Sequence, residues 1–479
     1  MSAVNLPVAA LDDQPQHECG VFAVTGVENA AEAAFLGLYS LQHRGQESAG
    51  ISAVDEDGRA RAHRGSGLVA DVFDAESLQG LPGSTAVSHV RYSTSGGDRP
   101  ENVQPIVARY SAGDLAIAHN GNLTNHLELR NRLVADGAIF QSSSDSEVIV
   151  HLLAHSRHET IDGQVDDALS HLEGAFSLVI SVGDVLYAAV DPRGFRPLQL
   201  GRKGDGHVVA SESCAFDIVG AEFVRDILPG EVLRIHGSEV VKLRELPPAP
   251  QPAPCVFELV YFARPDSRIW GVSVDRARRA LGRTLAMEHP VEADAVMAVP
   301  DSANSAALGY SETSGTPFEL GLLRNHYVGR TFIRPSQADR DFGARIKYNP
   351  VREVIDGKRI VVVDDSLVRG TTSTSLVRFF RDAGAREVHL RIASPPVQYP
   401  CFYGIDLPSR DELLGANHSV DEIREMLGVD SLGYLSLEGM LEAVQESGPF
   451  CDACFSGDHP TRLADVEGGL ASPDDPPGC

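Results

Sequence analysis

The sequence predicts two domains of different fold class, an α+β domain followed by an α/β domain that contains a parallel sheet. The chain has 479 residues, which is too long for a single hydrophobic core. A proline-rich stretch at residues 247–254 interrupts it. Strand-like segments come in pairs before this stretch and alternate strictly with helix-like segments after it.

The proline-rich stretch is expected to be an extended connector. It holds five prolines in eight positions, so it can form neither a helix nor a central strand. We therefore expect domains at 19–246 and 255–462. Residues 1–18 are expected to form a leader that is removed, and residues 463–479, rich in Gly, Pro and Asp, a disordered tail.

The first domain shows short strand patterns and amphipathic helix patterns. Strands are predicted at 19–24, 115–120, 176–190 and 208–213, the third being a hairpin that turns at Gly183-Asp184. Helices are predicted at 30–42, 125–135 and 145–156, and Asp145 suits the cap position of the last one. Paired strands with helices grouped between them indicate antiparallel sheets covered by helices.

The second domain alternates between the two patterns. Helices are predicted at 273–289, 302–314 and 372–384, and strands at 293–300, 358–365 and 387–395. This order is typical of βαβ units, which form a parallel sheet.

Composition and charge exclude several classes of protein. Hydrophobic residues make up 43% of the chain, without the long apolar run that a membrane span requires. The leader has no Lys or Arg and lacks the pattern of a secretory signal, so we expect a cytoplasmic protein with reduced thiols. A net charge of −26 argues against nucleic-acid binding. An anionic ligand needs a local basic island, and residues 324–352 supply one; alternatively this is a solvated face.

The segment "RIVVVDDSLVRGTTS" (359–373) combines a buried strand, two carboxylates and a loop that opens a helix. Parallel sheets bind ligands at the carboxyl ends of their strands, and a helix N-terminus favours a phosphate. Asp364 and Asp365 suit ribose hydroxyls or a hydrated Mg²⁺. The alternative is an ordinary turn with exposed aspartates.

This segment resembles the phosphoribosyl pyrophosphate (PRPP) loop of type I phosphoribosyltransferases. The resemblance implies that Asp364 and Asp365 hold the ribose and the magnesium, and that Ser302 in "VPDSANSAA" places a hydroxyl near the metal. It assigns the 5′-phosphate to Arg369, Gly370, Thr371, Thr372 and Ser373.

Cys19 begins a strand directly after the leader. If the chain is cut before Cys19, the new α-amino group, whose pKa lies near 7.7 to 8.0, becomes a base beside the thiol. Taken alone, this cysteine fits a small buried hydrophobe at the start of a strand better than a nucleophile.

Three further motifs in the first domain offer groups suited to substrate binding and catalysis. Arg91 can grip a substrate carboxylate. Asn120 and Gly121, expected in a tight turn, can direct an amide and a backbone N–H at an oxyanion. Asp145 can pair with a substrate amine. Each motif alone also fits a surface arginine, a hairpin turn or a helix cap.

Together "ECGVFAV", "LQHRGQESAG", "HVRYST", "HNGNL" and "SDSE" resemble the class II glutamine amidotransferase domain, an N-terminal nucleophile glutaminase. The resemblance implies an αββα sandwich that hydrolyses glutamine to glutamate and ammonia. Within it, Cys19 would be the nucleophile, Arg91 and Asp145 the glutamine holders, and Asn120 with Gly121 the oxyanion site.

Joined to a PRPP loop, this domain is similar to the amidophosphoribosyltransferase family, which opens purine (IMP) biosynthesis. The implied reaction converts glutamine, PRPP and water to 5-phosphoribosylamine, pyrophosphate and glutamate. The segment around Arg330 resembles the family's flexible loop over PRPP. The family also implies Mg²⁺ as cofactor, purine nucleotide feedback inhibitors and a homotetramer, with no nucleic-acid or membrane partner.

Four cysteines could bind a metal: Cys255, Cys401, Cys451 and Cys454. Four thiolates suit zinc or an iron–sulfur cluster, and the residues alone do not choose. The resemblance to the leader-containing branch of the family favours [4Fe-4S]. Cys214 matches no ligand position and is expected to be a buried hydrophobe, and Cys479 to be a tail residue.

Two other functions fit part of the sequence. A different amidotransferase would deliver ammonia to a sugar phosphate or an aspartyl adenylate, but the PRPP loop argues against it. A PRPP-sensing regulator with an inactive glutaminase domain is disfavoured because the separate glutaminase motifs are all complete.

Overall fold

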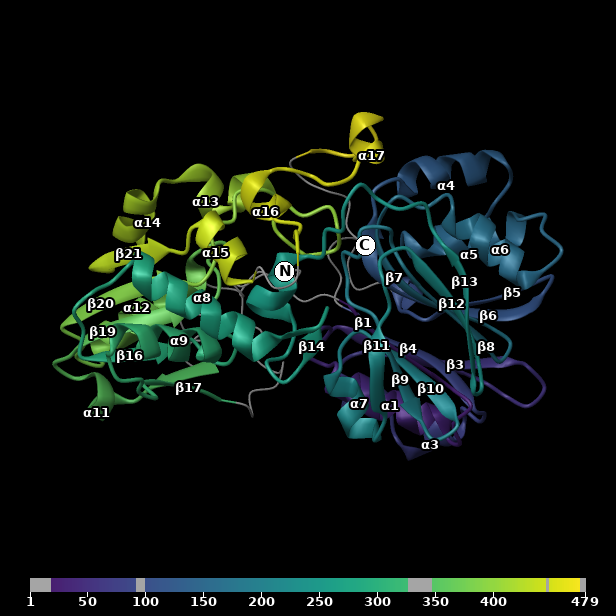
Figure 1. The fold of residues 1–479 in the computed structure, drawn as a ribbon, viewed down its shortest axis with the longest axis horizontal. Helices are drawn as coiled ribbons and strands as arrows, with labels where there is room; N and C mark the ends of the chain where they lie inside the picture. Colours follow the sequence, from purple (N-terminus) through teal and green to yellow (C-terminus); the bar gives the residue numbers. More distant parts are fainter. Residues whose placement is uncertain (1–18, 92–99, 326–346, 445–447, 474–479) are drawn as a thin grey trace, which may run out of the picture.

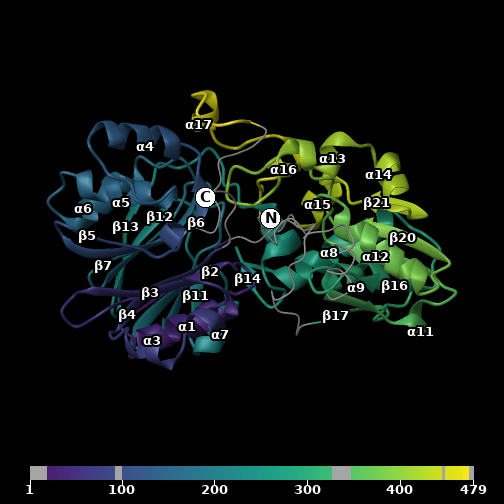
Figure 2. The ribbon, with the colours of Figure 1, turned by 180° about the vertical axis from the view of Figure 1, so that it is seen from behind.

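The computed structural model describes residues 19–91, 100–325, 347–444 and 448–473. Two domains lie side by side (Figures 1 and 2), and they confirm the predicted order of an α+β domain followed by an α/β domain. The leader and most of the basic island fall outside the described residues.

The first domain contains two antiparallel sheets. One has the spatial order β11 (Glu222–Asp226), β9 (Gln199–Lys203), β10 (Gly206–Ala210), β1 (Gly20–Thr25), β4 (Thr85–Arg91), β2 (Ser48–Val54) and β3 (Ala60–Ser66). The other has the order β13 (Glu239–Glu245), β12 (Glu231–His236), β8 (Val185–Val190), β7 (Gly174–Val182), β6 (Gly113–Leu123) and β5 (Ile106–Tyr110). Val182 pairs with Val185, which confirms the hairpin turn at Gly183-Asp184.

Helices cover the outer faces of both sheets, which confirms the αββα sandwich. The first sheet carries α1 (Ala30–Ser40), α2 (Val69–Val72), α3 (Ala75–Gln79) and α7 (Cys214–Val219). The second carries α4 (His126–Ala135), α5 (Ser146–His155) and α6 (Ile161–Leu169), and the short helix η2 (Pro100–Asn102) precedes β5.

Strand β1 shows why its sequence is apolar from Val21 to Val24. Side chains alternate between the two faces of a strand, and both faces of β1 are covered. Val21 and Ala23 belong to the core between the two sheets, whereas Phe22 and Val24 belong to the core under the helices. Strand β1 is therefore central and rigid, and it holds the residue before it in place.

The second domain is built on a parallel sheet in the order β16 (Ala295–Ala298), β19 (Arg359–Asp364), β20 (Glu387–Ile392) and β21 (Ser431–Tyr434). Its longer helices are α8 (Val274–Glu288), α9 (Asn304–Ser314), α12 (Thr371–Asp382), α14 (Val420–Leu427) and α15 (Leu437–Ala443). Val361 and Val363 face one core, and Ile360 and Val362 face the other, so β19 is buried on both sides.

Short elements complete this domain. They are the π-helical turn η3 (Glu258–Phe262), the ribbon β14 (Arg268–Ile269) with β15 (Val272–Ser273), the ribbon β17 (Leu322–Arg324) with β18 (Tyr348–Pro350), α11 (Arg352–Ile355), η4 (Arg410–Glu412), α13 (Leu414–Asn417) and α16 (Ala453–Ser456).

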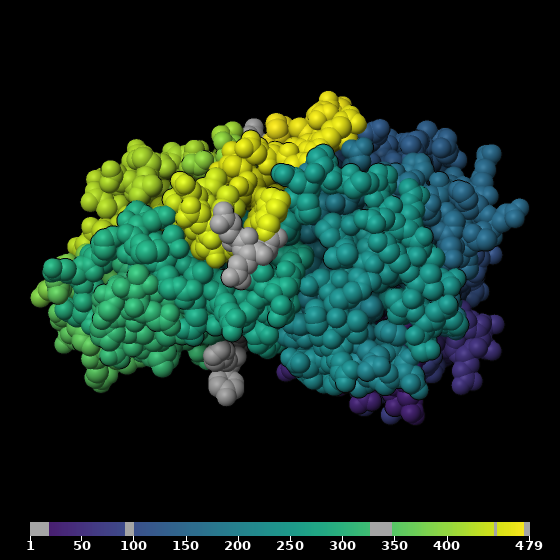
Figure 3. Space-filling model, in the orientation of Figure 1, coloured from purple at the N-terminus to yellow at the C-terminus, as the bar shows by residue number. Residues whose placement is uncertain are grey.

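The expectation of a disordered tail from residue 463 is wrong for its first part. Helix α17 (Ala464–Glu467) lies beside α4 of the first domain, and the space-filling view shows the C-terminal segment lying across both domains (Figure 3). Asp465 explains the order: its carboxylate accepts hydrogen bonds from the backbone N–H groups of Leu127 and Glu128, both at 2.9 Å. These are unsatisfied donors of the first turn of α4, which a carboxylate stabilises.

The connector contains no helix or strand, in line with the prediction, but it is packed rather than loose. Ala253 is buried, and its N–H donates to the carbonyl of Arg193 at 2.8 Å. In the part of the chain that the structure describes, no helix has the length and apolar character needed to cross a bilayer.

Candidate active sites

Cys19 lies at the start of the central strand β1 and is partly exposed. The next residue, Gly20, pairs with Val90 of β4, so Cys19 lies beside the end of β4. The carbonyl oxygen of Cys19 accepts a hydrogen bond from Nε of Arg44 at 3.0 Å. The main chain of the predicted nucleophile is thus held by Arg44, and the residue itself is partly exposed.

Arg91 is the last residue of β4 and is buried. Its carbonyl oxygen accepts a hydrogen bond from the N–H of Glu47 at 3.1 Å. The loop before Glu47 packs closely here, since a Cβ at Gly45 would lie 2.7 Å from the backbone nitrogen of Arg91. The structure therefore places Arg91 next to Cys19, as a glutamine-binding role requires.

Asn120 and Gly121 do not form the expected tight turn: both lie inside β6, paired with Ser177 and Phe176 of β7. The turn prediction is wrong because an Asn-Gly pair resembles a hairpin turn, whereas here Gly121 takes a φ of 144° within a continuous strand. A Cβ at Gly121 would lie 2.2 Å from the carbonyl oxygen of Ala175. Only glycine fits this close approach.

The side chain of Asn120 is suited to an oxyanion role. It is 1% exposed, and its Nδ2 has no hydrogen-bond partner among the described residues. A buried amide donor without a partner is costly, and such donors occur where a ligand supplies the acceptor. The structure thus presents a free N–H group on the strand that carries Gly121.

Asp145 precedes α5 but does not cap it. Its Oδ2 instead accepts from the N–H of Leu123 at 3.1 Å, and its Oδ1 accepts from the hydroxyl of Ser146 at 3.1 Å. Burial opposes the charged form, but the nearby His119, together with the Leu123 amide, outweighs it and holds the pKa of Asp145 well below its ordinary value. Asp145 is therefore a buried anion beside β6, available to a substrate ammonium group.

A hydrogen bond between the sheets brings these residues to one place. Nε2 of His89, two residues before Arg91, donates to the carbonyl oxygen of His119, one residue before Asn120. His119 in turn lies 3.0 Å from the hydroxyl of Ser146 through its Nδ1. The sequence analysis did not identify these histidines, because a buried histidine in a strand has no distinctive local pattern.

In the second domain, Asp364 ends β19 and Asp365 follows it, and both are buried. The N–H of Asp365 donates to Oδ1 of Asp364 at 2.9 Å. The hydroxyls of Ser302 and Ser366 donate to the two oxygens of Asp365. Burial raises the pKa of Asp365. The structure therefore joins the two predicted PRPP segments, which lie far apart in sequence, at the carboxyl edge of the sheet.

The predicted phosphate loop occupies the N-terminus of α12. Gly370 has a φ of 78°, and a Cβ there would lie 2.5 Å from a side-chain carbon of Leu414. The residues that follow differ in exposure: Thr371 is exposed, Thr372 is half-buried and Ser373 is buried. Arg369 donates from Nε to Glu412 at 2.8 Å. The loop is thus shaped by a residue that must be glycine, and it exposes the first N–H groups of a helix.

Arg330 and the expected flexible loop lie outside the described residues. Two described members of the basic island have partners in their own domain. Arg324 pairs with Asp301 at 3.2 Å, and Arg352 donates to the carbonyl of Asp382 at 2.8 Å. These two arginines therefore fit the alternative of a solvated face with paired side chains.

The four predicted metal-ligand cysteines gather at the boundary between the domains. Cys255 and Cys451 form a backbone bridge. The carbonyl of Cys454 accepts from the N–H of Tyr399 at 3.1 Å, and Tyr403 donates its N–H to the sulfur of Cys401 at 3.3 Å. The segments around residues 255, 400 and 454 are therefore held together.

The electrostatics of these thiols also indicate proximity. Burial, followed by the charges of Cys255, Cys401 and Cys451, raises the pKa of the Cys454 thiol well above its ordinary value. Burial raises the pKa of Cys451 to about 12. Within the described ranges, no group of three or more His, Cys, Asp or Glu side chains is arranged to hold a metal ion. Cys214 is buried in the first domain, as expected, and Cys479 is outside the described residues.

The loop after β20 lies against strands of the first domain, which the sequence analysis did not anticipate. Nδ2 of Asn122 donates to the carbonyl of Phe402 at 2.9 Å, and Arg196 donates to the carbonyl of Tyr403 at 2.7 Å. A Cβ at Gly404 would lie 2.9 Å from the carbonyl carbon of Gly121. The second domain thus reaches the strand that carries Asn120 and Gly121, the residues predicted to form the oxyanion site.

The chain is similar to known proteins along most of its length. A family model described as a glutamine amidotransferase domain matches residues 89–217. Amidophosphoribosyltransferase of Bacillus subtilis is 49% identical over 452 residues, which cover 93% of this chain and 94% of the relative. Amidophosphoribosyltransferase 2 of Arabidopsis thaliana, a chloroplastic protein, is 50% identical over 453 residues, covering 94% and 81% of the two chains.

Solved structures agree with these relatives. The glutamine PRPP amidotransferase of B. subtilis, complexed with ADP and GMP, superposes with a TM-score of 0.87 at 48% identity, covering 93% of this chain and 98% of that one. A structure described as the allosteric regulatory enzyme of purine biosynthesis gives a TM-score of 0.88 at 49% identity, covering 93% and 97%.

Proposed function

This chain belongs to the amidophosphoribosyltransferase family, and we propose that the residues gathered at its two sites carry out the two halves of that reaction. The enzyme is a glutamine-dependent transferase that forms 5-phosphoribosylamine, pyrophosphate and glutamate from glutamine, PRPP and water. The assignment of individual residues is the proposal.

In the first half-reaction, we assign the attack on the glutamine carboxamide to the thiol of Cys19. Removal of residues 1–18 would free the α-amino group of Cys19, which then takes the thiol proton and gives it to the departing ammonia. Nδ2 of Asn120 and the N–H of Gly121 donate to the oxyanion. Arg91 and Asp145 hold the α-carboxylate and the α-ammonium of glutamine. Water then hydrolyses the thioester to glutamate.

In the second half-reaction, Asp364 and Asp365 hold the ribose hydroxyls of PRPP. The N–H groups at the start of α12 and the hydroxyls of Thr371, Thr372 and Ser373 hold the 5′-phosphate. Ammonia displaces pyrophosphate at C1 of the sugar. Bound Mg²⁺ would neutralise the pyrophosphate, and the carboxylates with the hydroxyl of Ser302 fit a hydrated magnesium ion because they are oxygen ligands next to a phosphate site.

The observation that carries the residue assignment is Nδ2 of buried Asn120, which has no partner in the part of the chain that the structure describes, on a strand beside buried Asp145. A structural asparagine in a strand would have its amide paired. The test is a kinetic comparison of glutamine-dependent and ammonia-dependent synthesis in variants of each site. Loss of ammonia-dependent synthesis on changing Asn120 would contradict the division of roles.

We also propose a [4Fe-4S] cluster bound by Cys255, Cys401, Cys451 and Cys454. Four cysteines suit zinc as well as a cluster, and the resemblance to the leader-containing branch of the family favours the cluster. The packing of the segments that carry these cysteines against one another supports a shared site. A cluster would act structurally, tying three segments of the second domain together at the domain boundary. Intact mass with iron and sulfide content tests leader removal and cluster identity together, and zinc without sulfide would refute the cluster.

Regulation is a further part of the proposal. The B. subtilis relative was solved with ADP and GMP, so we propose that purine nucleotides bind and inhibit this enzyme, and that it assembles as a homotetramer in the cytoplasm. Light scattering tests the oligomeric state, and the reaction rate with and without GMP tests the inhibition. A monomer, or a rate that GMP does not change, would contradict the corresponding part of the proposal.

A further inference from the structure

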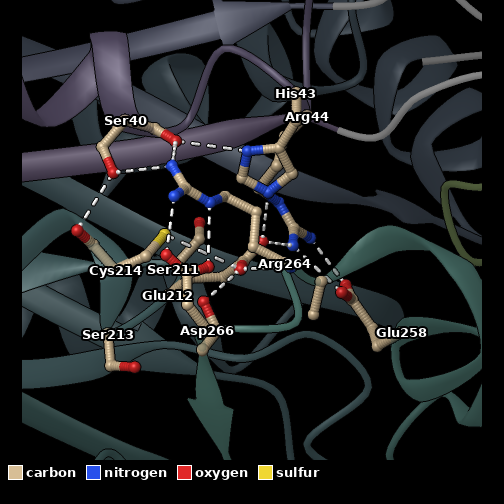
Figure 4. Close-up of polar contacts among 12 residues, drawn as sticks. Ser40, His43, Arg44, Ser211, Glu212, Ser213, Cys214, Glu258, Arg264 and Asp266 are labelled. Atoms are coloured by element: carbon tan, nitrogen blue, oxygen red, sulfur yellow. Dashed lines mark hydrogen bonds and ion pairs between the residues drawn. The ribbon is translucent and has the colours of Figure 1, made fainter. Parts of the chain in front are cut away.

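Four fully buried charged side chains form a network at the domain boundary (Figure 4 shows most of it). Arg44, Glu212 and Arg196 come from the first domain and Glu258 from the second, and each side chain is 0% exposed. Two positive and two negative charges balance. Buried ion pairs contribute little net stability, because desolvation offsets their attraction. The network therefore needs another explanation than stability.

Arg44 is the centre of this boundary network. Its Nε donates to the carbonyl oxygen of Cys19 at 3.0 Å. Its two terminal nitrogens donate to Glu258, Nη1 to Oε2 at 3.0 Å and Nη2 to Oε1 at 2.6 Å, in the paired geometry that matches a guanidinium to a carboxylate. Nη1 also donates to Oε1 of Glu212 at 2.6 Å. Nε of the guanidinium thus holds the nucleophile residue, and two carboxylates fix the positions of the two terminal nitrogens.

The two carboxylates differ in what else they hold. Glu212 also accepts from the hydroxyl of Ser267 at 2.6 Å and the N–H of Arg264 at 2.9 Å, and it lies 2.7 Å from Nε2 of His43. Glu258 faces Arg44 with both of its oxygens and lies 3.6 Å from Arg196. The orientation of Arg44 is therefore set most directly by Glu258.

Glu258 is itself rigidly placed. It begins η3, a π-helical turn, and such turns occur frequently at functional sites. Arg278 of α8 donates to the carbonyls of Leu259 and Ala263 at 2.9 and 2.7 Å, which fixes the rest of the turn. Arg196 donates to the carbonyl of Tyr403 in the same domain as Glu258. The turn η3 thus belongs to the second domain, whereas the carboxylate of its first residue, Glu258, binds Arg44 of the first domain.

We propose that Glu258 is a positioning residue for glutamine hydrolysis, supplied by the phosphoribosyltransferase domain to the glutaminase site. It orients Arg44, and Arg44 holds the main chain of Cys19 so that the thiol and the α-amino group meet the substrate carboxamide. This inference rests on the proposed function, in which Cys19 is the nucleophile. Small displacements of a reacting group cost large factors in rate.

The test uses the full enzyme with Glu258→Gln, which keeps the shape and removes the charge. We expect kcat for glutamine hydrolysis to fall by about tenfold to a hundredfold. The KM for glutamine should change less than about threefold, because Arg91 and Asp145 hold the substrate without Glu258. Ammonia-dependent synthesis should stay within about twofold of the unaltered enzyme, since its site does not use Cys19. Glu258→Asp, which restores the charge, should recover part of the lost kcat.

The matched control is Glu231→Gln. Glu231 is a buried carboxylate paired with Arg225 at 2.6 Å inside the first domain, and it should leave the kcat for glutamine hydrolysis unchanged. An unchanged kcat in Glu258→Gln would overturn the inference. Equal losses of both activities, with no recovery in Glu258→Asp, would also overturn it, because they indicate a merely structural role. Cys19→Ala distinguishes failure of this inference from failure of the proposed function. If the Cys19→Ala enzyme hydrolyses glutamine normally, the proposed function itself fails.

Discussion

Nε2 of His89 donates a hydrogen bond to the carbonyl oxygen of His119 at 3.0 Å, and this bond joins the two sheets of the glutaminase domain. His89 is 0% exposed. Burial lowers its pKa to about 3, and the positive charge of Arg91 adds to the effect, while the bond to His119 opposes it. The imidazole is therefore neutral at physiological pH, with its proton on Nε2.

This relationship predicts acid destabilisation. The unfolded chain binds a proton at His89 near pH 6.5, and the folded protein only near pH 3. Between these values the unfolded state holds more protons, so stability falls as the pH falls. The expected loss of unfolding free energy from His89 is about 1.4 kcal/mol per pH unit. Urea unfolding at pH 7, 5.5 and 4 measures it.

The variant for this experiment is His89→Gln, which keeps a side-chain N–H donor and does not titrate. Its stability should depend less steeply on pH over this range. The exposed His155 on α5 provides the control as His155→Gln. Identical pH slopes for His89→Gln and the unaltered protein would show that His89 does not carry the effect.

Cys19→Ala should abolish glutamine-dependent product and leave ammonia-dependent product largely intact. The reason is that only the first site loses its nucleophile, while the carboxylates at the end of β19 are untouched. Assays with glutamine and with ammonium chloride at high pH measure the two activities. A folded variant that has lost both would refute the picture of two separate sites.

Asn120→Ala should lower kcat for glutamine hydrolysis by about 10² to 10³, as loss of one oxyanion donor does elsewhere. Because Nδ2 of Asn120 has no partner among the described residues, its removal should change the thermal midpoint little. Steady-state kinetics and a thermal melt check both statements. A strong fall in the midpoint with an unchanged kcat would assign Asn120 a structural role instead.

Asp365→Asn should remove both glutamine-dependent and ammonia-dependent synthesis, because both need PRPP held at this carboxylate. Asp294→Asn is the matched control. Asp294 pairs at 3.0 Å with Arg359, the first residue of β19, and so lies at the opposite end of this strand from Asp365. PRPP binding by calorimetry separates a binding defect from misfolding. Normal PRPP turnover in Asp365→Asn would overturn the ligand assignment.

Cys454→Ser should lower the iron and sulfide content and the thermal midpoint together, because the cluster would tie three segments of the chain. Cys214→Ser is the control: this thiol is also buried, in the core of the first domain, and its loss should leave the iron content unchanged. Colorimetric iron and sulfide assays check the prediction. Full iron content in Cys454→Ser would exclude it as a ligand.

The sequence predicted most of the fold because local patterns agree with the tertiary structure. Helix α12 and strand β19 follow directly from their apolar periodicity, and the hairpin at Gly183-Asp184 follows from its turn residues. The Asn120-Gly121 pair misled the analysis because its glycine serves a close approach inside a strand rather than a turn. A pattern of two residues does not separate these uses of glycine.

The residues proposed as nucleophile and ligands could be selected from sequence, since each lies in a motif whose chemistry is local. Contacts between distant segments could not be predicted from sequence. Glu212 and Glu258 give no sign in sequence that they meet at Arg44, because buried charges depend on partners that only the fold brings together. The order of α17 was missed for the same reason, since its Asp465 is stabilised by a helix more than 300 residues earlier.

The turn η3 is held from both domains. Its first residue, Glu258, pairs with Arg44 of the first domain, and the carbonyls of Leu259 and Ala263 accept hydrogen bonds from Arg278 of α8 in the second domain. A displacement of α8 relative to the first domain would therefore pull on Arg44 and, through it, on the main chain of Cys19.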